Sequence, residues 1–273
     1  MKIGLSGATP LWFAATRIGI STVAAFALLA AIGRLHRPAW RDLPAVASIG
    51  ICQLTLFHSF SQLGLRYLEA GRSAVLAYTT TLFLIPLARL TGEAIGRWHA
   101  IGCGLGMAGV VVLLAPQSID WGIEGSIAGH LWLLMAAASW ALAIFHARRH
   151  DWHLGPLELL PWQLLLATVL VFPLAALFEP EGGVALTGGT LACLAYLGLL
   201  AGPAATWAAT SVSRQLPTTV SSLGFLGVPV LGLTASALWL GETVDGPLLL
   251  GAALILAGVG VVILGSGRRP AGS

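Results

Sequence analysis

Four polar residues stand at helical spacing inside an otherwise apolar stretch: Thr55, His58, Ser59 and Gln62. Positions i, i+3, i+4 and i+7 share one face of a helix. Hydroxyl, imidazole and amide groups on one face can hold a small polar ligand through hydrogen bonds. We interpret this face as the wall of a substrate-binding cavity. The alternative is hydrogen bonding between helices that only fixes their packing.

Two further features could give that face its chemistry. Imidazole titrates near neutral pH, so His58 is a candidate for proton coupling; alternatively it is a neutral histidine bonded to a neighbour, since burial disfavours the charged form. Arg17 is the basic residue within a predicted helix, about two turns from its end. Its guanidinium could bind a carboxylate, or the side chain could extend to the membrane surface. Gln163 holds the corresponding position in the second half of the chain.

Two predicted helices carry polar or aromatic residues ahead of a proline. Tyr78 and Thr81 precede Pro86, and Ser221 and Phe225 precede Pro229. Proline removes one backbone hydrogen bond, and the carbonyl that it frees is tolerated at membrane depth only against protein or a wet cavity. We predict substrate contacts from these four residues and hinges at the two prolines. The alternative is a simple bend that improves packing.

Trp140 and Trp207 lie further inside predicted helices than most of the ten tryptophans. A buried indole needs a partner for its N–H, and its ring face suits amphipathic or cationic ligands. We predict that both contribute to substrate binding; the alternative is aromatic packing in the core or against lipid.

Metal, cofactor and enzyme chemistry are not predicted. His146, His150, Asp151 and His153 have ligand-like spacing, but the two arginines between the first two histidines repel a cation. Neither a GxSxG nor an HExxH pattern occurs. A P-loop is excluded because the one lysine is Lys2.

The elements that must position these residues are membrane helices. The 273 residues are 57% hydrophobic and 9% charged, against roughly 25% charged in soluble domains. Long runs without charged residues recur along the chain. Because lipid offers no hydrogen-bond partners, the backbone N–H and C=O groups of such runs must bond to one another, so an all-α polytopic membrane protein is expected. The predicted helices are Pro10–Ile32, Leu43–Leu65, Gly71–Leu90, Arg97–Leu114, Ile127–Ala147, Glu158–Phe178, Gly189–Arg214, Thr218–Leu240 and Gly246–Leu264.

The distribution of arginine predicts the orientation. In this nine-helix arrangement ten arginines lie on one side, and Lys2, Arg66 and Arg72 on the other. Basic loops stay in the cytoplasm. The C-terminus is therefore expected inside the cell and the chain in the inner (plasma) membrane. The glycine-rich faces of the fourth and ninth helices predict close packing within a monomer or in a homodimer.

The chain contains an internal repeat. Gly92-Glu93 and Gly241-Glu242 follow apolar helices, and each precedes another apolar run, 149 residues apart. The orientation places the two turns on opposite sides, so the repeats are inverted, with five helices in the second and four in the first. We predict a first repeat at 1–114 that lacks its first helix, a linker at 115–126, a second repeat at 127–264 and a tail at 265–273.

These features resemble the EamA-type family of the drug/metabolite transporter superfamily. The residues that carry the resemblance are LTGE at Leu90–Glu93, WLGE at Trp239–Glu242, AGV at Ala108–Val110 and Ala257–Val259, AAASWAL at Ala136–Leu142, and TPLWFAATR ending at Arg17. The resemblance implies two inverted five-helix repeats around a central cavity, and the export of amino acids or other small metabolites. The aromatic amino acid exporters of the superfamily are the members to compare first.

The function expected from these observations is secondary export of small amphipathic metabolites, amino acids above all, by alternating access around a mid-membrane cavity. The expected partners are a small-molecule substrate and the lipid bilayer, with no nucleic acid. The alternatives are a membrane-embedded enzyme and a structural membrane protein without transport activity.

Overall fold

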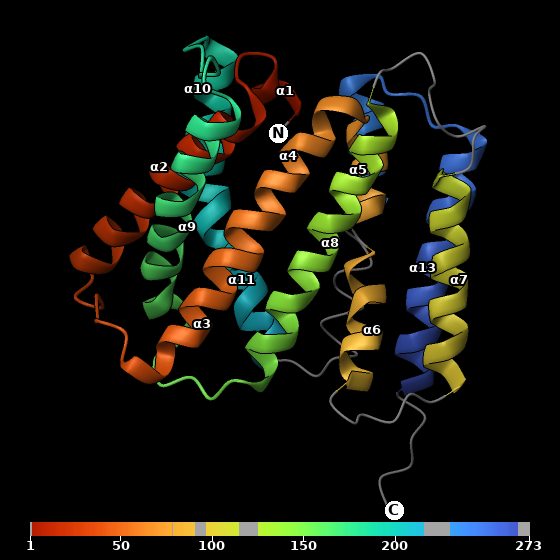
Figure 1. Ribbon diagram of the computed structural model, residues 1–273, viewed down its shortest axis with the longest axis horizontal. Helices are drawn as coiled ribbons and strands as arrows, with labels where there is room; N and C mark the ends of the chain where they lie inside the picture. The colour runs from red at the N-terminus through yellow and green to blue at the C-terminus, as the bar shows by residue number, and fades with distance from the viewer. Residues whose placement is uncertain (1, 78, 91–96, 115–124, 216–229, 267–273) are drawn as a thin grey trace, which may run out of the picture. The chain divides into compact units, whose positions relative to one another are not determined.

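The computed structural model describes residues 2–77, 79–90, 97–114, 125–215 and 230–266 (Figure 1). Over these residues the chain is helical, apart from turns, loops and one isolated antiparallel β-bridge between Ala8 and Val184. Within the described ranges, six helical stretches are long and apolar enough to cross a membrane. The protein is an all-α polytopic membrane protein, which confirms the predicted fold class.

Helix occurs in the described part of every predicted segment. The elements are α1 Lys2–Leu5, α2 Pro10–Ala31, η1 Trp40–Asp42, α3 Leu43–Ser48, η2 Ile49–Leu56, α4 Phe57–Tyr67, α5 Ala70–Ala77, α6 Thr80–Leu90, α7 Arg97–Leu114, α8 Ser126–Arg149, α9 Pro156–Phe178, α10 Gly188–Leu194, η4 Ala195–Ala201, α11 Gly202–Gln215 and α13 Gly246–Ser266. Val230–Leu240 is also helical. The described residues from Arg97 to Leu114 are helical throughout, as predicted.

The third predicted helix is divided, which corrects the continuous helix expected from Gly71 to Leu90. α5 ends at Ala77 and α6 begins at Thr80. Thr79 Oγ1 donates to Leu76 O at 2.7 Å, and Thr80 Oγ1 donates to Ala77 O at 2.7 Å. Threonine hydroxyls that capture nearby carbonyls compete with the helical backbone pattern. Pro86 lies inside α6, which continues past it.

Carboxylates from distant segments satisfy the backbone N–H groups at helix starts. Glu179 Oε2 accepts from the N–H of Leu11 and Trp12 at the start of α2. The carboxylate of Glu242 accepts from the N–H of Ala70 and Gly71 at the start of α5. Negative charge is favourable at this end of a helix. Gly241, with φ of +66°, forms the turn that presents Glu242.

The chain forms two compact units. Unit 1 contains residues 1–66 and 142–215, and unit 2 contains residues 67–141 and 216–273. Each unit combines a segment from the first half of the chain with one from the second half. The division into sequence repeats at 115–126 stays a prediction.

In unit 1, α2 packs along α9 in the opposite direction. Thr22 and Thr168 share a hydrogen bond of 2.7 Å between their hydroxyls. On either side of it, Trp12 packs edge-on against Phe172, and Phe26 against Trp162. Two π-helical segments, η2 and η4, also belong to this unit. Apolar residues of α2, η2 and α9 form the core between them.

In unit 2, α7 and α13 pack backbone to backbone through glycine. A Cβ on Gly109 would come 2.7 Å from Gly251 O, and a Cβ on Gly258 would come 2.8 Å from Gly106 N. Small residues permit this close approach between membrane helices. The predicted glycine faces of the fourth and ninth helices therefore pack against each other within the chain.

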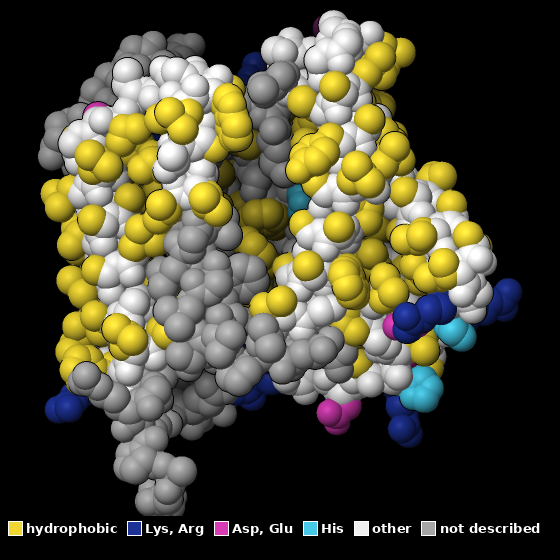
Figure 2. Space-filling model, turned by 180° about the vertical axis from the view of Figure 1, so that it is seen from behind, with side chains coloured by type: hydrophobic (Ala, Val, Ile, Leu, Met, Phe, Trp, Pro, Cys, Tyr) yellow, Lys and Arg dark blue, Asp and Glu magenta, His cyan; other side chains and the backbone are white. Residues whose placement is uncertain are grey.

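The surface agrees with a lipid environment. Figure 2 shows hydrophobic side chains along the helices on the face that it draws, and the charged side chains that it shows lie toward helix ends. Large apolar side chains such as Val23, Val169, Leu177 and Leu200 are exposed on predicted spans. In water such a surface would be unfavourable, whereas in a bilayer it meets hydrocarbon.

Candidate functional site

Arg17 is buried inside unit 1. Only 3% of the residue is exposed, and its Nε and Nη2 atoms have no hydrogen-bond partner. Arg34 pairs with Glu158 and Arg72 with Asp245, and Arg17 takes part in neither pair. The side chain does not extend to the surface, so the snorkelling alternative is wrong. A buried guanidinium without a counter-charge is unfavourable unless something else neutralises it.

His58 lies within electrostatic reach of Arg17, whose positive charge acts on the imidazole. The Nδ1 atom of His58 bonds to Gln53 O at 2.9 Å. Because a carbonyl oxygen can only accept, Nδ1 carries the proton, and Nε2 of the neutral ring is an acceptor. The ring also packs edge-on against Phe57, with ring centroids 5.2 Å apart. These two contacts hold the His58 ring in place and leave Nε2 able to accept a hydrogen bond.

The polar face of α4 divides into satisfied and unsatisfied groups. Thr55 Oγ1 donates to Gly50 O at 2.8 Å, so its hydroxyl is used within η2. Ser59 Oγ has no partner, and Gln62 is 0% exposed with neither its Oε1 nor its Nε2 bonded. The alternative of packing bonds therefore fits Thr55, while Ser59 and Gln62 keep their bonding capacity for something else.

Further unbonded buried polar atoms belong to the same unit. They are on Thr9, Ser61 of α4, His146 of α8, Gln163 of α9, and Thr210 and Ser211 of α11. Buried polar groups in proteins are almost always hydrogen-bonded, so such a group calls for an explanation such as water or a ligand. The sequence indicated Gln163 as the counterpart of Arg17, and both are buried.

The two π-helical segments place Arg17 and Gln163 in similar surroundings. A Cβ on Gly198 of η4 would come 3.4 Å from Arg17 O, and a Cβ on Gly50 of η2 would come 3.1 Å from Gln163 O. Ser21 Oγ donates to Gly198 O at 2.8 Å and lies 3.0 Å from Arg17 O. Each π-helical segment therefore packs by a glycine against the backbone of the helix that carries one of these polar residues. π-helical turns occur frequently at functional sites.

The other predicted site residues belong to other helices or lie outside the described residues. Trp207 lies on α11 with 44% of the residue exposed, and Trp140 is partly buried on α8. Thr81 and the exposed Pro86 lie in α6 of unit 2. Tyr78, Ser221, Phe225 and Pro229 fall outside the described residues.

Unit 2 contains an arginine and a histidine that the sequence reading passed over. His130 on α8 is 0% exposed, and its Nδ1 atom bonds to Ser126 O at 2.8 Å while Nε2 has no partner. Arg72 of α5 acts electrostatically on His130 and pairs with Asp245 at 2.9 Å. His130 lies in the second turn of α8. The sequence feature that could have predicted its burial is the apolar run on either side of His130.

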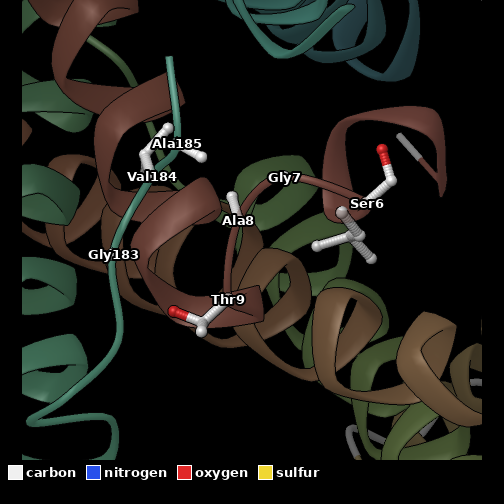
Figure 3. Close-up of a pocket in the computed structure, with 8 residues that line it drawn as sticks. Ser6, Gly7, Ala8, Thr9, Gly183, Val184 and Ala185 are labelled. Carbon is white, nitrogen blue, oxygen red and sulfur yellow. The ribbon is translucent and has the colours of Figure 1, made fainter. Parts of the chain in front are cut away.

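The surface pocket in Figure 3 offers little chemistry. Backbone and small side chains from Leu5–Thr9 and Gly183–Ala185 line it, with hydroxyls on Ser6 and Thr9. Charged side chains are absent from this lining. Within the described ranges, no three His, Cys, Asp or Glu side chains are grouped to hold a metal ion. His150, a member of the predicted histidine cluster, stacks on His146 and donates from Nε2 to Arg41 O.

Comparisons with known proteins identify relatives of this chain among transporters. Residues 1–115 and 127–264 match the family model of the EamA-like transporter family. The chain is 23% identical to an uncharacterized transporter of Bacillus subtilis, over 95% of this chain and 89% of the relative. It is 29% identical to a probable amino-acid metabolite efflux pump of Salmonella typhimurium, over 97% of this chain and 89% of the relative.

A solved crystal structure shares the fold, with a TM-score of 0.65 and 23% sequence identity, over 97% of this chain and 93% of the other. The apolar helices are long enough to span a bilayer, and the relatives are named as transporters. These findings indicate a multi-pass membrane protein that moves small molecules rather than an enzyme. Since the family model covers most of the chain, this protein belongs to the EamA-like transporter family, within the drug/metabolite transporter superfamily.

Proposed function

We propose that this protein is a secondary exporter of small amphipathic metabolites, with amino acids as the substrate class. The observation that carries the proposal is the set of buried, unbonded polar atoms in unit 1, on Arg17, Ser59, Gln62 and Gln163. In hydrocarbon such groups are unfavourable unless a ligand or water satisfies them. A relative named as a probable amino-acid metabolite efflux pump supports the substrate class.

The substrate site in this proposal has a described part and a predicted part. Arg17, His58, Ser59 and Gln62 form the part in unit 1, and Thr55 holds the backbone of η2. The predicted contributors are Tyr78, Thr81, Trp140, Trp207, Ser221 and Phe225. Trp207, with its exposed ring, has the weakest support among them.

Transport would proceed by alternating access between two inverted repeats, with the helices at Pro86 and Pro229 as hinges. The turn at Thr79, between the end of α5 and the start of α6, would serve as a second hinge in the same predicted helix. Crosslinks that join the cytoplasmic ends of the third and eighth predicted helices are expected to stop turnover. Unchanged turnover in the crosslinked protein would refute this mechanism.

The test of function is uptake into proteoliposomes that contain the purified protein. The panel comprises labelled tryptophan, phenylalanine and threonine. Saturable uptake that disappears in the triple variant Thr55→Ala, His58→Ala and Gln62→Ala supports the proposal. A matched triple variant at lipid-exposed positions, Val23→Ala, Val169→Ala and Leu177→Ala, is expected to retain uptake. Absence of uptake for the whole panel would contradict amino acids as the substrate class.

A further inference from the structure

Arg17 requires an anion that the described protein does not supply. It is one of two arginines that are at least nine-tenths buried, and the other, Arg72, has Asp245 at 2.9 Å. Two donor atoms of the Arg17 guanidinium, Nε and Nη2, are buried and unbonded. Nε and one Nη nitrogen can present parallel N–H groups along one edge of the planar guanidinium, which fits the two oxygens of a carboxylate. The missing partner is therefore a small anion with that geometry.

Hydrogen-bond acceptors belong to the same unit as this donor. Because His58 Nδ1 donates to Gln53 O, Nε2 of the neutral ring offers a lone pair. Gln62 follows one helical turn later on α4, and its Oε1 is an unbonded buried acceptor. Leu54 and Leu63, which flank His58 and Gln62 in the sequence, pack in the same apolar cluster as Ala14 and Ile18 beside Arg17. The charge of Arg17 also acts on the His58 ring.

A ligand that satisfies both sides carries an anion and a cationic donor close together. Arg17 offers donors only, whereas His58 Nε2 and Gln62 Oε1 accept. A dicarboxylate would leave its second charge without a cation, because the described part of unit 1 contains no second buried arginine or lysine. An amine without a carboxylate would leave Arg17 unpaired. The α-amino acid zwitterion places both groups on one carbon and meets both requirements.

We propose that Arg17 binds the α-carboxylate of the substrate and that His58 Nε2 and Gln62 Oε1 accept from its α-ammonium group. This inference rests on the proposed transport of amino acids and adds the recognition of the backbone end of the substrate. Selectivity for side chains then depends on other residues. Both free backbone groups are required, and the identity of the side chain is secondary.

The first test needs no variant. Proteoliposomes with the wild-type protein take up labelled tryptophan, phenylalanine or threonine while the unlabelled amino acid, its α-amide or its N-acetyl derivative competes. For each amino acid that is transported, the amide and the N-acetyl form are expected to compete about a hundredfold less well, because a site built to bind a polar group strongly rejects analogues without it. Equal competition by the amide would overturn the role of Arg17. Equal competition by the N-acetyl form would overturn the roles of His58 and Gln62.

The second test compares variants at Arg17. Arg17→Gln, which copies the residue at the counterpart position 163, is expected to lose uptake, while Arg17→Lys restores part of it through charge without the planar fork. The control, Arg34→Gln, removes an exposed arginine from the same unit and is expected to retain uptake. Normal uptake by Arg17→Gln would overturn the proposal. If no amino acid enters the wild-type vesicles, the proposed function fails too, which separates that result from equal competition by analogues.

Discussion

The two buried arginines of this protein occupy contrasting environments. Arg72 in unit 2 acts on a buried histidine, His130, and also has a carboxylate partner in Asp245. Arg17 in unit 1 acts on His58 and has no carboxylate partner among the described residues. The charge of Arg72 is thus paired within the protein, whereas two guanidinium nitrogens of Arg17 make no hydrogen bond. The same pair of residue types can therefore serve stability in one unit and ligand binding in the other.

The contrast extends to packing. Unit 2 joins α7 and α13 at close backbone contacts, and among its described residues the one unbonded buried side-chain atom is His130 Nε2. Unit 1 contains unbonded groups on α2, α4, α9 and α11. Functional sites commonly give up stability in this way. Unit 2 is thus expected to respond to substitution mainly in stability, and unit 1 mainly in transport.

The largest effect on stability is expected at the glycine contacts of unit 2. Gly109→Val should lower the free energy of unfolding by about 3 kcal/mol, because even a Cβ there would come 2.7 Å from Gly251 O. Thermal unfolding in detergent measures the change. Gly104→Val on the same helix is the control, since a Cβ at Gly104 meets nothing within 4 Å. Similar losses in both variants would mean that the close contact is not the cause.

A smaller loss is expected from Arg72→Met. It leaves Asp245 without its partner, at a cost of about 2 kcal/mol, reduced from that of a fully buried pair because the Asp245 side chain is 43% exposed. Adding Asp245→Asn should recover part of the loss, since asparagine keeps the bond to Leu248 N at the start of α13. A double variant less stable than either single variant would contradict a pairing role.

Arg17→Met should change stability in the opposite direction. Methionine removes an unpaired buried charge and keeps much of the side-chain volume, so the free energy of unfolding should rise by about 1 kcal/mol. Uptake should be lost in the same protein. The measurement is thermal unfolding beside vesicle uptake. Destabilisation similar to that of Arg72→Met would remove the contrast between the two arginines.

The smallest effect on stability is expected from Ser59→Ala. Its hydroxyl makes no hydrogen bond, so the change in unfolding free energy should stay within about 0.5 kcal/mol. Affinity for the transported amino acid should nevertheless fall severalfold. Thr55→Val provides the comparison, because Thr55 donates to Gly50 O and its loss should reduce stability more than affinity. If Ser59→Ala reduced stability more than affinity and Thr55→Val reduced affinity more than stability, the roles assigned to the two residues would be exchanged.

Much of the fold could be predicted from the sequence because lipid imposes long apolar helices. The ends of α2 and α9 were predicted within two residues. The break at Thr79 was not, because proline was taken as the helix breaker, whereas threonine hydroxyls occupy the carbonyls there. The π-helical segments carry no sequence signal, since they depend on packing against neighbouring helices.

The site was predictable only in part. The spacing of His58, Ser59 and Gln62 placed them on one face, but which of them bond to the backbone depends on contacts that a spacing pattern does not contain. From its position along the helix, the Arg17 side chain could have reached the membrane surface or stayed in the protein interior. The neighbouring helices bury it in the interior. His130 was overlooked because its distance from the helix start says nothing about what covers it.

The π-helical pitch of η2 has a consequence for the polar face that follows it. η2 ends at Leu56, and α4 with His58 and Gln62 begins at Phe57. A π-helical turn contains one more residue than an α-helical turn, so releasing that residue rotates everything beyond it by about 100° around the helix axis. Such a rotation would carry His58 and Gln62 away from Arg17 without moving α2. A change of pitch within one helix could thus separate the proposed carboxylate-binding side of the site, Arg17, from its proposed ammonium-binding side, His58 and Gln62.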